Sequence, residues 1–199
     1  QSFLKLIRDK CSKSNVLLIF DEVQTGMGRT GTLWGYEQFG IEPDVCTLAK
    51  GLGGGHAIGA LLVNQSADIF EPGDHASTFG GNPFACRAAL TVGEEIKRRD
   101  LLTEIKKRGD QLKDGLTNLS EKYSNIIFKV RGRGLIQGPV LKDNINLSSL
   151  DIVKAALQEK LLIVSAGEKV VRMVPPLTIT KKEINQLLER LDACLKKIS

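Results

Sequence analysis

The stretch NVLLIFDE, residues 15–22, decides the fold class. Its first six residues, 15–20, form a nearly continuous apolar run, which predicts a β-strand buried on both faces. The run stops at two adjacent carboxylates, Asp21 and Glu22. A strand of this kind, ending in acidic side chains, is typical of the central sheet of an α/β protein.

The segments around this stretch continue the same alternation. Residues 3–11 have the spacing of the end of an amphipathic helix, and a Gly/Pro-rich loop precedes a further helix. We expect strands at 44–49 and 59–63 and that helix at about 83–98. Strands that alternate with helices predict an α/β fold with a mostly parallel sheet.

The pattern changes after about residue 99. Helix, strand and helix signals then follow one another as in an α+β module, and Ser148 and Thr180 each begin a capping box, SSLD and TKKE. The expected elements are helices at 101–122, from Ser148 and from Thr180, and strands at 125–131, 134–141, 161–165 and 169–174. We therefore predict two domains, 1–98 as part of a large domain and 99–199 as a small C-terminal domain.

Composition excludes several classes of function. The net charge of +5 comes partly from basic clusters at 97–99 and 106–108, but no aromatic residues are interleaved with them, which argues against nucleic-acid binding. No apolar run approaches the roughly 18 residues of a membrane span, and no signal peptide is visible. Four cysteines without C-x-x-C spacing and two histidines without ligand-spaced partners predict free thiols in a reducing, cytoplasmic compartment and no metal site.

The segment GMGRTG, Gly26 to Gly31, matches the dinucleotide pattern G-x-G-x-x-G. Its context argues against a nicotinamide-dependent oxidoreductase. Asp21 and Glu22 stand at the strand end that a pyrophosphate would approach, and the following residues do not predict a long helix that could offer its N-terminus. The match is interpreted as a coincidence of spacing, and the oxidoreductase is kept as an alternative.

A second arrangement involves Asp21 and Lys50, each at the carboxyl end of a predicted strand. Ligands of open α/β sheets bind at these ends. A carboxylate and a lysine in one pocket suit pyridoxal 5'-phosphate: the amine forms a Schiff base with the aldehyde, and the carboxylate keeps the pyridine nitrogen protonated. A buried Asp–Lys ion pair or two exposed strand ends would explain the same residues.

Three motifs now narrow the choice: LLIFDEVQTGMGRTG, DVCTLAKGLGGG and GDHASTFGGNPFACRAAL. In this order and spacing they resemble the class-III (ornithine-type) aminotransferases, which are pyridoxal-phosphate enzymes of fold type I. The resemblance is dense over 16–95 and looser but collinear to the C-terminus. It implies that this chain corresponds to the C-terminal half of such an enzyme.

The resemblance also implies roles for individual residues. Asp21 matches the partner of the pyridine nitrogen, Val23 the residue packed on one ring face, and Gln24 the amide that meets the ring hydroxyl. Lys50 matches the Schiff-base lysine, which also shuttles a proton once it is released. Glu22 is included only as a neighbour in the cofactor-contacting D-E-V-Q stretch.

Three further residues are implied at the edges of the site. Thr78 matches a residue that reaches the cofactor phosphate of the partner subunit in a homodimer, and Ser77 lies at the adjoining substrate contact. Arg172, between apolar neighbours, is expensive to bury unless it meets an anion. It matches the family's substrate-carboxylate arginine, although an exposed edge-strand arginine would also fit. Arg131 and Arg133 are assigned no site role.

The implied reaction moves the terminal amino group of N-acetylornithine to 2-oxoglutarate in arginine biosynthesis, with ornithine, succinylornithine or 4-aminobutyrate as alternative donors. Three elements of the family's N-terminal half are absent from this sequence: the Gly-Thr phosphate loop, the second ring-stacking aromatic and the arginine for the acylated substrate. We therefore expect residues 1–199 alone to bind the cofactor poorly and to be inactive.

Overall fold

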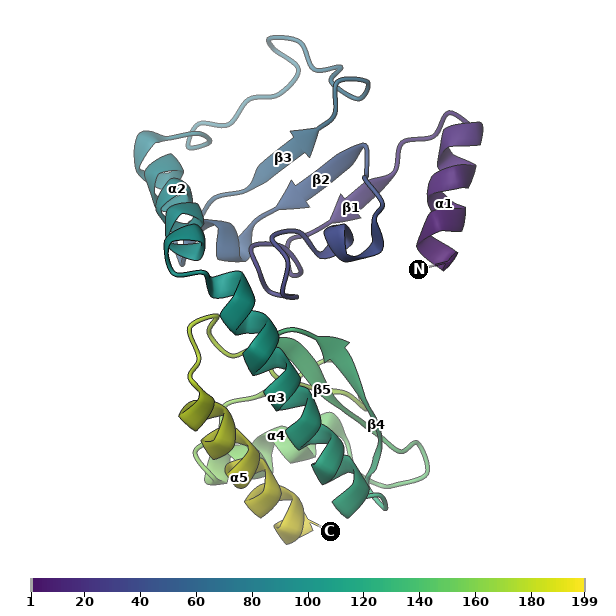
Figure 1. Cartoon of the computed structure of the whole chain (residues 1–199), viewed down its shortest axis with the longest axis vertical. Helices are drawn as coiled ribbons and strands as arrows, with labels where there is room; N and C mark the ends of the chain where they lie inside the picture. The colour runs from purple at the N-terminus through teal and green to yellow at the C-terminus, as the bar shows by residue number, and fades with distance from the viewer. Residues whose placement is uncertain (1, 199) are drawn as a thin grey trace. The chain divides into compact units, whose positions relative to one another are not determined.

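The structure is a computed structural model that describes residues 2–198. The chain forms two compact units, one up to Leu102 and the other from Thr103 onward (Figure 1). No helix within the described residues is long and apolar enough to cross a membrane.

The first unit contains the sheet that carries the acidic strand end. Helix α1 (Ser2–Lys13) leads into β1 (Ile19–Asp21), followed by β2 (Val45–Leu48) and β3 (Ala60–Val63). The strand order is β1-β2-β3, with β2 parallel to β1 and antiparallel to β3 (Figure 1). The expected strands at 44–49 and 59–63 are thus confirmed, and the mixed α/β architecture with them.

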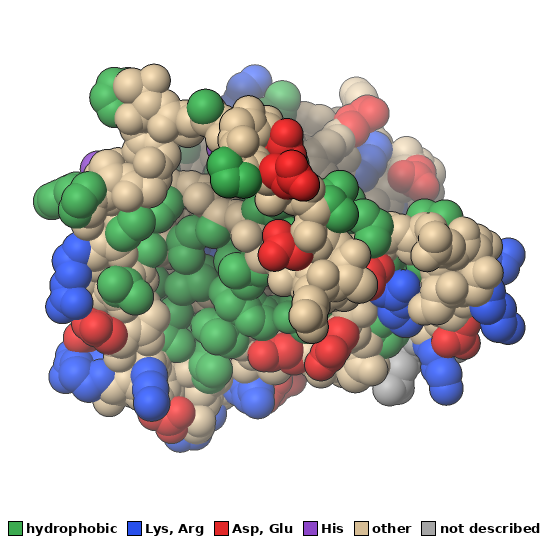
Figure 2. Space-filling model, turned by 90° about the horizontal axis from the view of Figure 1, so that it is seen from above, with side chains coloured by type: hydrophobic (Ala, Val, Ile, Leu, Met, Phe, Trp, Pro, Cys, Tyr) green, Lys and Arg blue, Asp and Glu red, His purple; other side chains and the backbone are tan. Residues whose placement is uncertain are grey.

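The burial of the β1 segment differs from the prediction. Leu18 is 8% exposed, but Leu17 and Ile19 are 47% and 57% exposed. Successive side chains of an extended segment point to opposite faces, so only one face is covered here. The prediction of a strand buried on both faces was wrong for this chain, because an apolar run does not reveal which faces are covered. Figure 2 shows hydrophobic side chains gathered on one part of the surface.

A single carboxylate ties the elements of the first unit together. Asp44 accepts hydrogen bonds from the backbone N–H of Leu18 at 2.7 Å, from Nη1 of Arg8 at 2.7 Å and from Nδ2 of Asn64 at 3.0 Å. These donors come from α1, from the start of the β1 segment and from the end of β3. The backbone donor of Leu18, followed by the Arg8 guanidinium, lowers the pKa of Asp44 below its ordinary value.

Helix α2 (Pro83–Arg98) begins where the sequence predicted. The Asn82 side chain accepts a hydrogen bond from the Ala85 N–H at 2.9 Å, and Pro83 occupies the first turn, where its missing N–H costs nothing. The helix packs against the 3-10 turn η2 (Lys50–Gly53). A Cβ added to Gly54 would lie 2.9 Å from Cγ2 of Val92, so this contact requires a glycine.

The second unit combines three helices with short antiparallel strands. Strand β5 pairs with β4 and is joined to the β7 segment by isolated bridges, and β7 pairs with β6. The strands expected at 161–165 and 169–174 shrink to two residues each, because their remaining contacts are isolated bridges and not a continuous ladder. The elements are α3 (Leu101–Lys122), β4 (Ile127–Arg133), β5 (Ile136–Leu141), α4 (Ser149–Gln158), β6 (Val164–Ser165), β7 (Val171–Arg172) and α5 (Lys181–Ile198).

Helices α3 and α5 lie side by side in this unit (Figure 1). A Cβ on Gly115 would lie 2.1 Å from Cδ1 of Leu188, so the Leu188 side chain of α5 packs directly over this glycine of α3. Both predicted capping boxes are present: Asp151 N–H donates to Ser148 Oγ at 3.3 Å, and Thr180 N–H donates to Glu183 Oε2 at 2.8 Å. The largest fully buried side chains form one core, including Ile105, Leu112, Leu116, Leu135, Leu141, Ile152, Met173, Ile184, Leu191 and Leu195.

Candidate active site

The parallel pair of strands brings two predicted site residues to one edge of the sheet. Asp21 is the last residue of β1 and is level with Thr47 of β2. Strand β2 ends at Leu48, and Lys50 follows at the start of η2. Because the two strands are parallel, their carboxyl ends lie at the same edge, where ligands of α/β sheets bind.

The Asp21 carboxylate is held in a defined orientation. Its Oδ1 accepts hydrogen bonds from the Val23 N–H at 2.9 Å and from Thr47 Oγ1 at 3.1 Å. The residue is exposed, so its carboxylate is accessible to a ligand. Thr47 was not predicted from the sequence. Aligning the carboxyl ends of the two parallel strands would have placed it beside Asp21.

Lys50 adopts an unusual backbone conformation. Its φ of 46° lies in the left-handed region, which is unfavourable for a residue with a Cβ. Gly54 and Gly55 follow with φ values of 60° and 112°, in keeping with the predicted tight turn after the lysine. The lysine side chain is exposed at the sheet edge. Backbone strain of this kind gathers at functional sites, where the surrounding structure maintains it.

The side chain of Glu22 is buried within the first unit and is not exposed at the sheet edge with Asp21 and Lys50. It is only 5% exposed, its Oε1 accepts from the Tyr36 N–H at 2.9 Å, and its Oε2 accepts from Thr25 Oγ1 at 2.5 Å. A buried carboxylate needs such partners to offset the loss of hydration. In this chain the side chain of Glu22 therefore anchors the loop between β1 and η1 (Gly35–Phe39).

The glycine pattern at 26–31 belongs to the same loop. A Cβ on Gly26 would lie 2.9 Å from the Glu22 carbonyl oxygen, so the turn requires glycine there. Met27 is 6% exposed, and a Cβ on Gly51 would lie 3.5 Å from the Met27 Cβ. The loop thus supports the lysine turn. Only a five-residue 3-10 helix follows it, so the pattern is not succeeded by the long helix that a dinucleotide site needs.

The remaining predicted residues lie on exposed segments. Val23 and Gln24 follow Asp21 directly, with Gln24 exposed. Ser77 and Thr78 are exposed in the loop that joins β3 to α2, where Ser77 Oγ accepts the Gly80 N–H at 3.0 Å. Within residues 2–198, no hydrogen bond joins Ser77 or Thr78 to Asp21 or Lys50.

Arg172 belongs to the second unit and lies partly buried on β7. It lines a cavity of about 240 Å³ together with residues of β4, β5 and the segment 166–171. The side chain is therefore neither fully buried nor a freely exposed edge residue.

Cys46 lies on β2 within the sheet of the first unit. Burial raises the pKa of its thiol to about 11, with further contributions from the negative charges of Glu22 and Asp21. At neutral pH the thiol therefore stays protonated and is a poor nucleophile. Across residues 2–198, no group of three or more His, Cys, Asp or Glu side chains could hold a metal ion.

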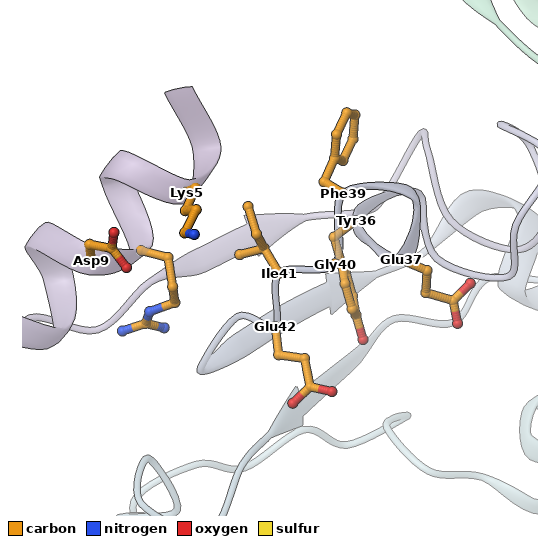
Figure 3. Close-up of a pocket in the computed structure, with 9 residues that line it drawn as sticks. Lys5, Asp9, Tyr36, Glu37, Phe39, Gly40, Ile41 and Glu42 are labelled. Atoms are coloured by element: carbon orange, nitrogen blue, oxygen red, sulfur yellow. The ribbon is translucent and has the colours of Figure 1, made fainter. Parts of the chain in front are cut away.

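Another cavity of the first unit, of about 1050 Å³, does not include the predicted site residues. Figure 3 shows Lys5 and Asp9 of α1 on one side and Ile41 and Glu42 on the other. Its charges are of both signs, and its arginine, Arg8, already pairs with Asp44 at 2.7 Å. This lining favours no single class of charged ligand.

Comparisons with known proteins give a consistent result. The family model "Aminotransferase class-III" matches residues 1–195. The acetylornithine aminotransferase of Prochlorococcus marinus is 60% identical over all 199 residues, which make up 48% of that protein. The acetylornithine aminotransferase of a Nostoc species is 50% identical over 99% of this chain and 46% of its own length. The chain spans about half the length of the curated relatives it matches.

Solved structures that superimpose on this chain are also aminotransferases. An ornithine aminotransferase from Plasmodium yoelii superimposes with a TM-score of 0.92 at 34% identity, covering 99% of this chain and 52% of its own. An N-acetylornithine aminotransferase from Stenotrophomonas maltophilia superimposes with a TM-score of 0.87 at 35% identity, covering 100% and 52%. The chain with Asp21 and Lys50 at one edge of a parallel strand pair therefore belongs to the class-III aminotransferase family.

Proposed function

We propose that the natural full-length protein is a pyridoxal-phosphate-dependent aminotransferase that moves the terminal amino group of N-acetylornithine to 2-oxoglutarate. The observation that carries this proposal is the placement of the Asp21 carboxylate and the Lys50 amine at one edge of the β1–β2 pair. The choice of acetylated substrate rests on relatives at 60% and 50% identity that are named acetylornithine aminotransferases.

The residues at the sheet edge fit this cofactor. Asp21 is fixed at Oδ1 by Val23 and Thr47, so its carboxylate can hold a protonated ring nitrogen through a charge-assisted hydrogen bond. Lys50 supplies an exposed amine at the same edge. When bound, pyridoxal phosphate would act as an electron sink for the carbon that loses or gains a proton.

In this proposal some residues of the chain bind the cofactor, and Lys50 transfers the proton. Asp21 keeps a positive charge on the ring, and Thr47 preserves the orientation of that carboxylate. Lys50, once its amine is free, would carry the proton from the substrate carbon that bears the amino group to the cofactor, and in the second half of the cycle it would carry a proton in the opposite direction, to the carbon of the amino acceptor. Val23 and Gln24 contact the ring, and Glu22 holds the loop that presents them.

The outer parts of the proposed site come from other segments. Arg172 binds a substrate carboxylate, Ser77 lies beside the substrate, and Thr78 reaches the cofactor phosphate of the partner subunit in a homodimer. In this proposal residues 1–98 form part of the cofactor-binding domain, and residues 99–199 form the small domain that carries Arg172. The enzyme would work in the cytoplasm, in arginine biosynthesis.

Ornithine is the second candidate donor, because ornithine aminotransferases are among the structures that superimpose well, with TM-scores such as 0.92. The same strand-edge residues would serve either donor. The two proposals differ only in which amino compound is accepted.

The test uses the natural full-length protein. We expect a visible absorbance band from bound cofactor, its removal by borohydride, and a label on the peptide that contains Lys50. A donor panel should show N-acetylornithine preferred over ornithine, succinylornithine and 4-aminobutyrate. A label on another lysine would contradict the site, whereas a preference for free ornithine would correct only the substrate. Binding of a nicotinamide cofactor without the visible band would favour the oxidoreductase alternative.

A further inference from the structure

One face of the second unit's sheet is strongly basic. Lys129, Arg131 and Arg133 alternate along β4 and are all exposed, so they share one face of the strand. Strand β4 is at the edge of its two-stranded pairing with β5. Exposed basic residues on an edge strand often serve to prevent pairing with another chain, and this role would explain the three charges by themselves.

Arg131 differs from its two neighbours in one respect: it lines the same cavity of about 240 Å³ as Arg172. The lining of this cavity contains two arginines and no carboxylate. Lys129 and Arg133 are not part of the lining. Edge protection does not account for a cavity that is lined by an arginine residue from each of two different strands.

Backbone packing keeps the space between the two arginines open. Arg131 is directly opposite Gly138 in the β4–β5 register. A Cβ on Gly138 would lie 1.7 Å from the Val171 carbonyl oxygen and 3.2 Å from the Arg172 Cα. The close approach of β5 to the β7 segment therefore requires glycine at 138. As a consequence, no side chain from this position fills the space beside Arg131 and Arg172.

We propose that Arg131 is a second substrate-carboxylate residue, which acts together with Arg172 in this cavity. The inference rests on the proposed function, in which Arg172 binds a substrate carboxylate, and it identifies Arg131 as a residue that sets the affinity for that group. The volume of about 240 Å³ is below the roughly 300–1,000 Å³ of whole-ligand pockets, so the cavity suits one end of a small dicarboxylate.

The chemistry of the two groups supports this pairing. A carboxylate has two oxygens with about four lone-pair sites, more than one guanidinium fork can fill. A second guanidinium can therefore donate to the same group without displacing the first, and each charge-assisted bond adds to affinity. Since Arg131 is exposed and Arg172 is partly buried, Arg131 can adjust to the ligand while Arg172 fixes its position.

The test measures binding and turnover in the natural full-length protein. Glutarate, a dicarboxylate that cannot be transaminated, is titrated by calorimetry, and KM for 2-oxoglutarate is measured in parallel. We expect Arg131→Met to weaken glutarate binding and to raise KM about tenfold, with kcat changed less than about twofold. Arg131→Lys keeps the positive charge but not the two-pronged geometry of the guanidinium group, so it should weaken glutarate binding by about threefold.

Arg133→Met is the matched control, since it removes the same charge from the same strand face outside the cavity. It should change glutarate binding by less than about twofold. Equal losses for the Arg131 and Arg133 variants would reduce the effect to overall charge and overturn the proposal, as would unchanged binding in Arg131→Met or no glutarate binding by the wild type. If the wild type binds glutarate through Arg131 but transaminates none of the donors, the carboxylate site stands and the proposed function fails.

Discussion

The two units of this chain differ in how completely they bury their apolar side chains. All of the largest fully buried side chains belong to the second unit, in and around α3, β5, α4 and α5. Most of the exposed large hydrophobic side chains belong to the first unit, among them Ile19, Leu61, Phe70, Phe79 and Phe84. The residues proposed for cofactor chemistry lie in the unit with the more open apolar surface.

This difference in burial separates the unit that contributes most to folding stability from the unit that carries the residues proposed for catalysis. The second unit closes a core of its own, which supplies most of the hydrophobic stabilisation. In the first unit, hydrogen bonds such as those to Asp44 connect the elements. This unit also exposes apolar side chains, and proteins commonly cover such surfaces with another surface. Substitutions in the two units should therefore have effects of different kinds.

The largest expected effect is chemical and comes from the first unit. Lys50→Gln in the full-length protein should lower turnover by at least about 10³-fold and abolish the visible band, because it removes the amine that we propose both as the Schiff-base partner and as the proton carrier. The side chain is exposed, so the midpoint of thermal unfolding measured without cofactor should stay within a few degrees of the wild type. Turnover above a tenth of the wild-type rate would show that Lys50 is not the reacting amine.

The next effect tests the difference in packing directly. Leu112→Ala, at a side chain 0% exposed, should lower the free energy of unfolding of the 199-residue chain by about 2–5 kcal/mol. Leu61→Ala, at a side chain 47% exposed, should cost less than about 1 kcal/mol. Urea unfolding of both variants makes the comparison. Equal losses would mean that the first unit is as well packed as the second.

The polar ties of the first unit should show a smaller, pH-dependent effect. The pKa of Asp44 is lowered in the folded state, so its stabilisation is present above the unfolded pKa of about 3.9 and is lost as pH falls through the folded value. Asp44→Asn should therefore cost about 1–2 kcal/mol at pH 7 and much less in strong acid. Unfolding curves at several pH values give this difference. A cost that does not vary with pH would exclude the charge of Asp44 as its source.

The smallest effect is expected at a helix end of the second unit. Thr180→Ala removes the hydroxyl that accepts the Glu183 N–H at 3.3 Å and should cost about 1 kcal/mol. Thr180→Ser keeps the hydroxyl and serves as the control. Denaturant midpoints of both variants should separate them, and a Ser variant as unstable as the Ala variant would point to lost methyl packing and not to the cap.

The helices could be predicted from the sequence almost to the residue, because their ends carry local signals. Asn82 with Pro83, Ser148 and Thr180 each satisfy backbone groups within one turn, and nothing distant is needed to recognise them. Strands β6 and β7 were predicted too long, because they pair with each other over two residues only, and the neighbouring contacts of the β7 segment with β5 are isolated bridges that a residue pattern does not reveal.

In the candidate site, too, the residues whose role depends on a neighbour on another strand could not be predicted from the sequence. Asp21 and Lys50 were recognisable because strand ends and a family resemblance coincide at them. Thr47 and Arg131 were missed, because each gains its proposed role only from a neighbour on an adjacent strand: the Asp21 carboxylate in one case and Arg172 in the other. The inward direction of Glu22 likewise depends on the Tyr36 N–H, fourteen positions along the chain.

The left-handed backbone of Lys50 has a consequence for how this chain can change over generations. A φ of 46° suits glycine or asparagine better than lysine, by roughly 1 kcal/mol. Selection for a sturdier fold alone would therefore tend to replace the lysine at this position. If Lys50 is the reacting amine, as we propose, its presence here is explained by catalytic demand outweighing conformational preference. A redesign of the sequence for thermal resistance alone would be expected to discard the amine on which the proposed reaction depends.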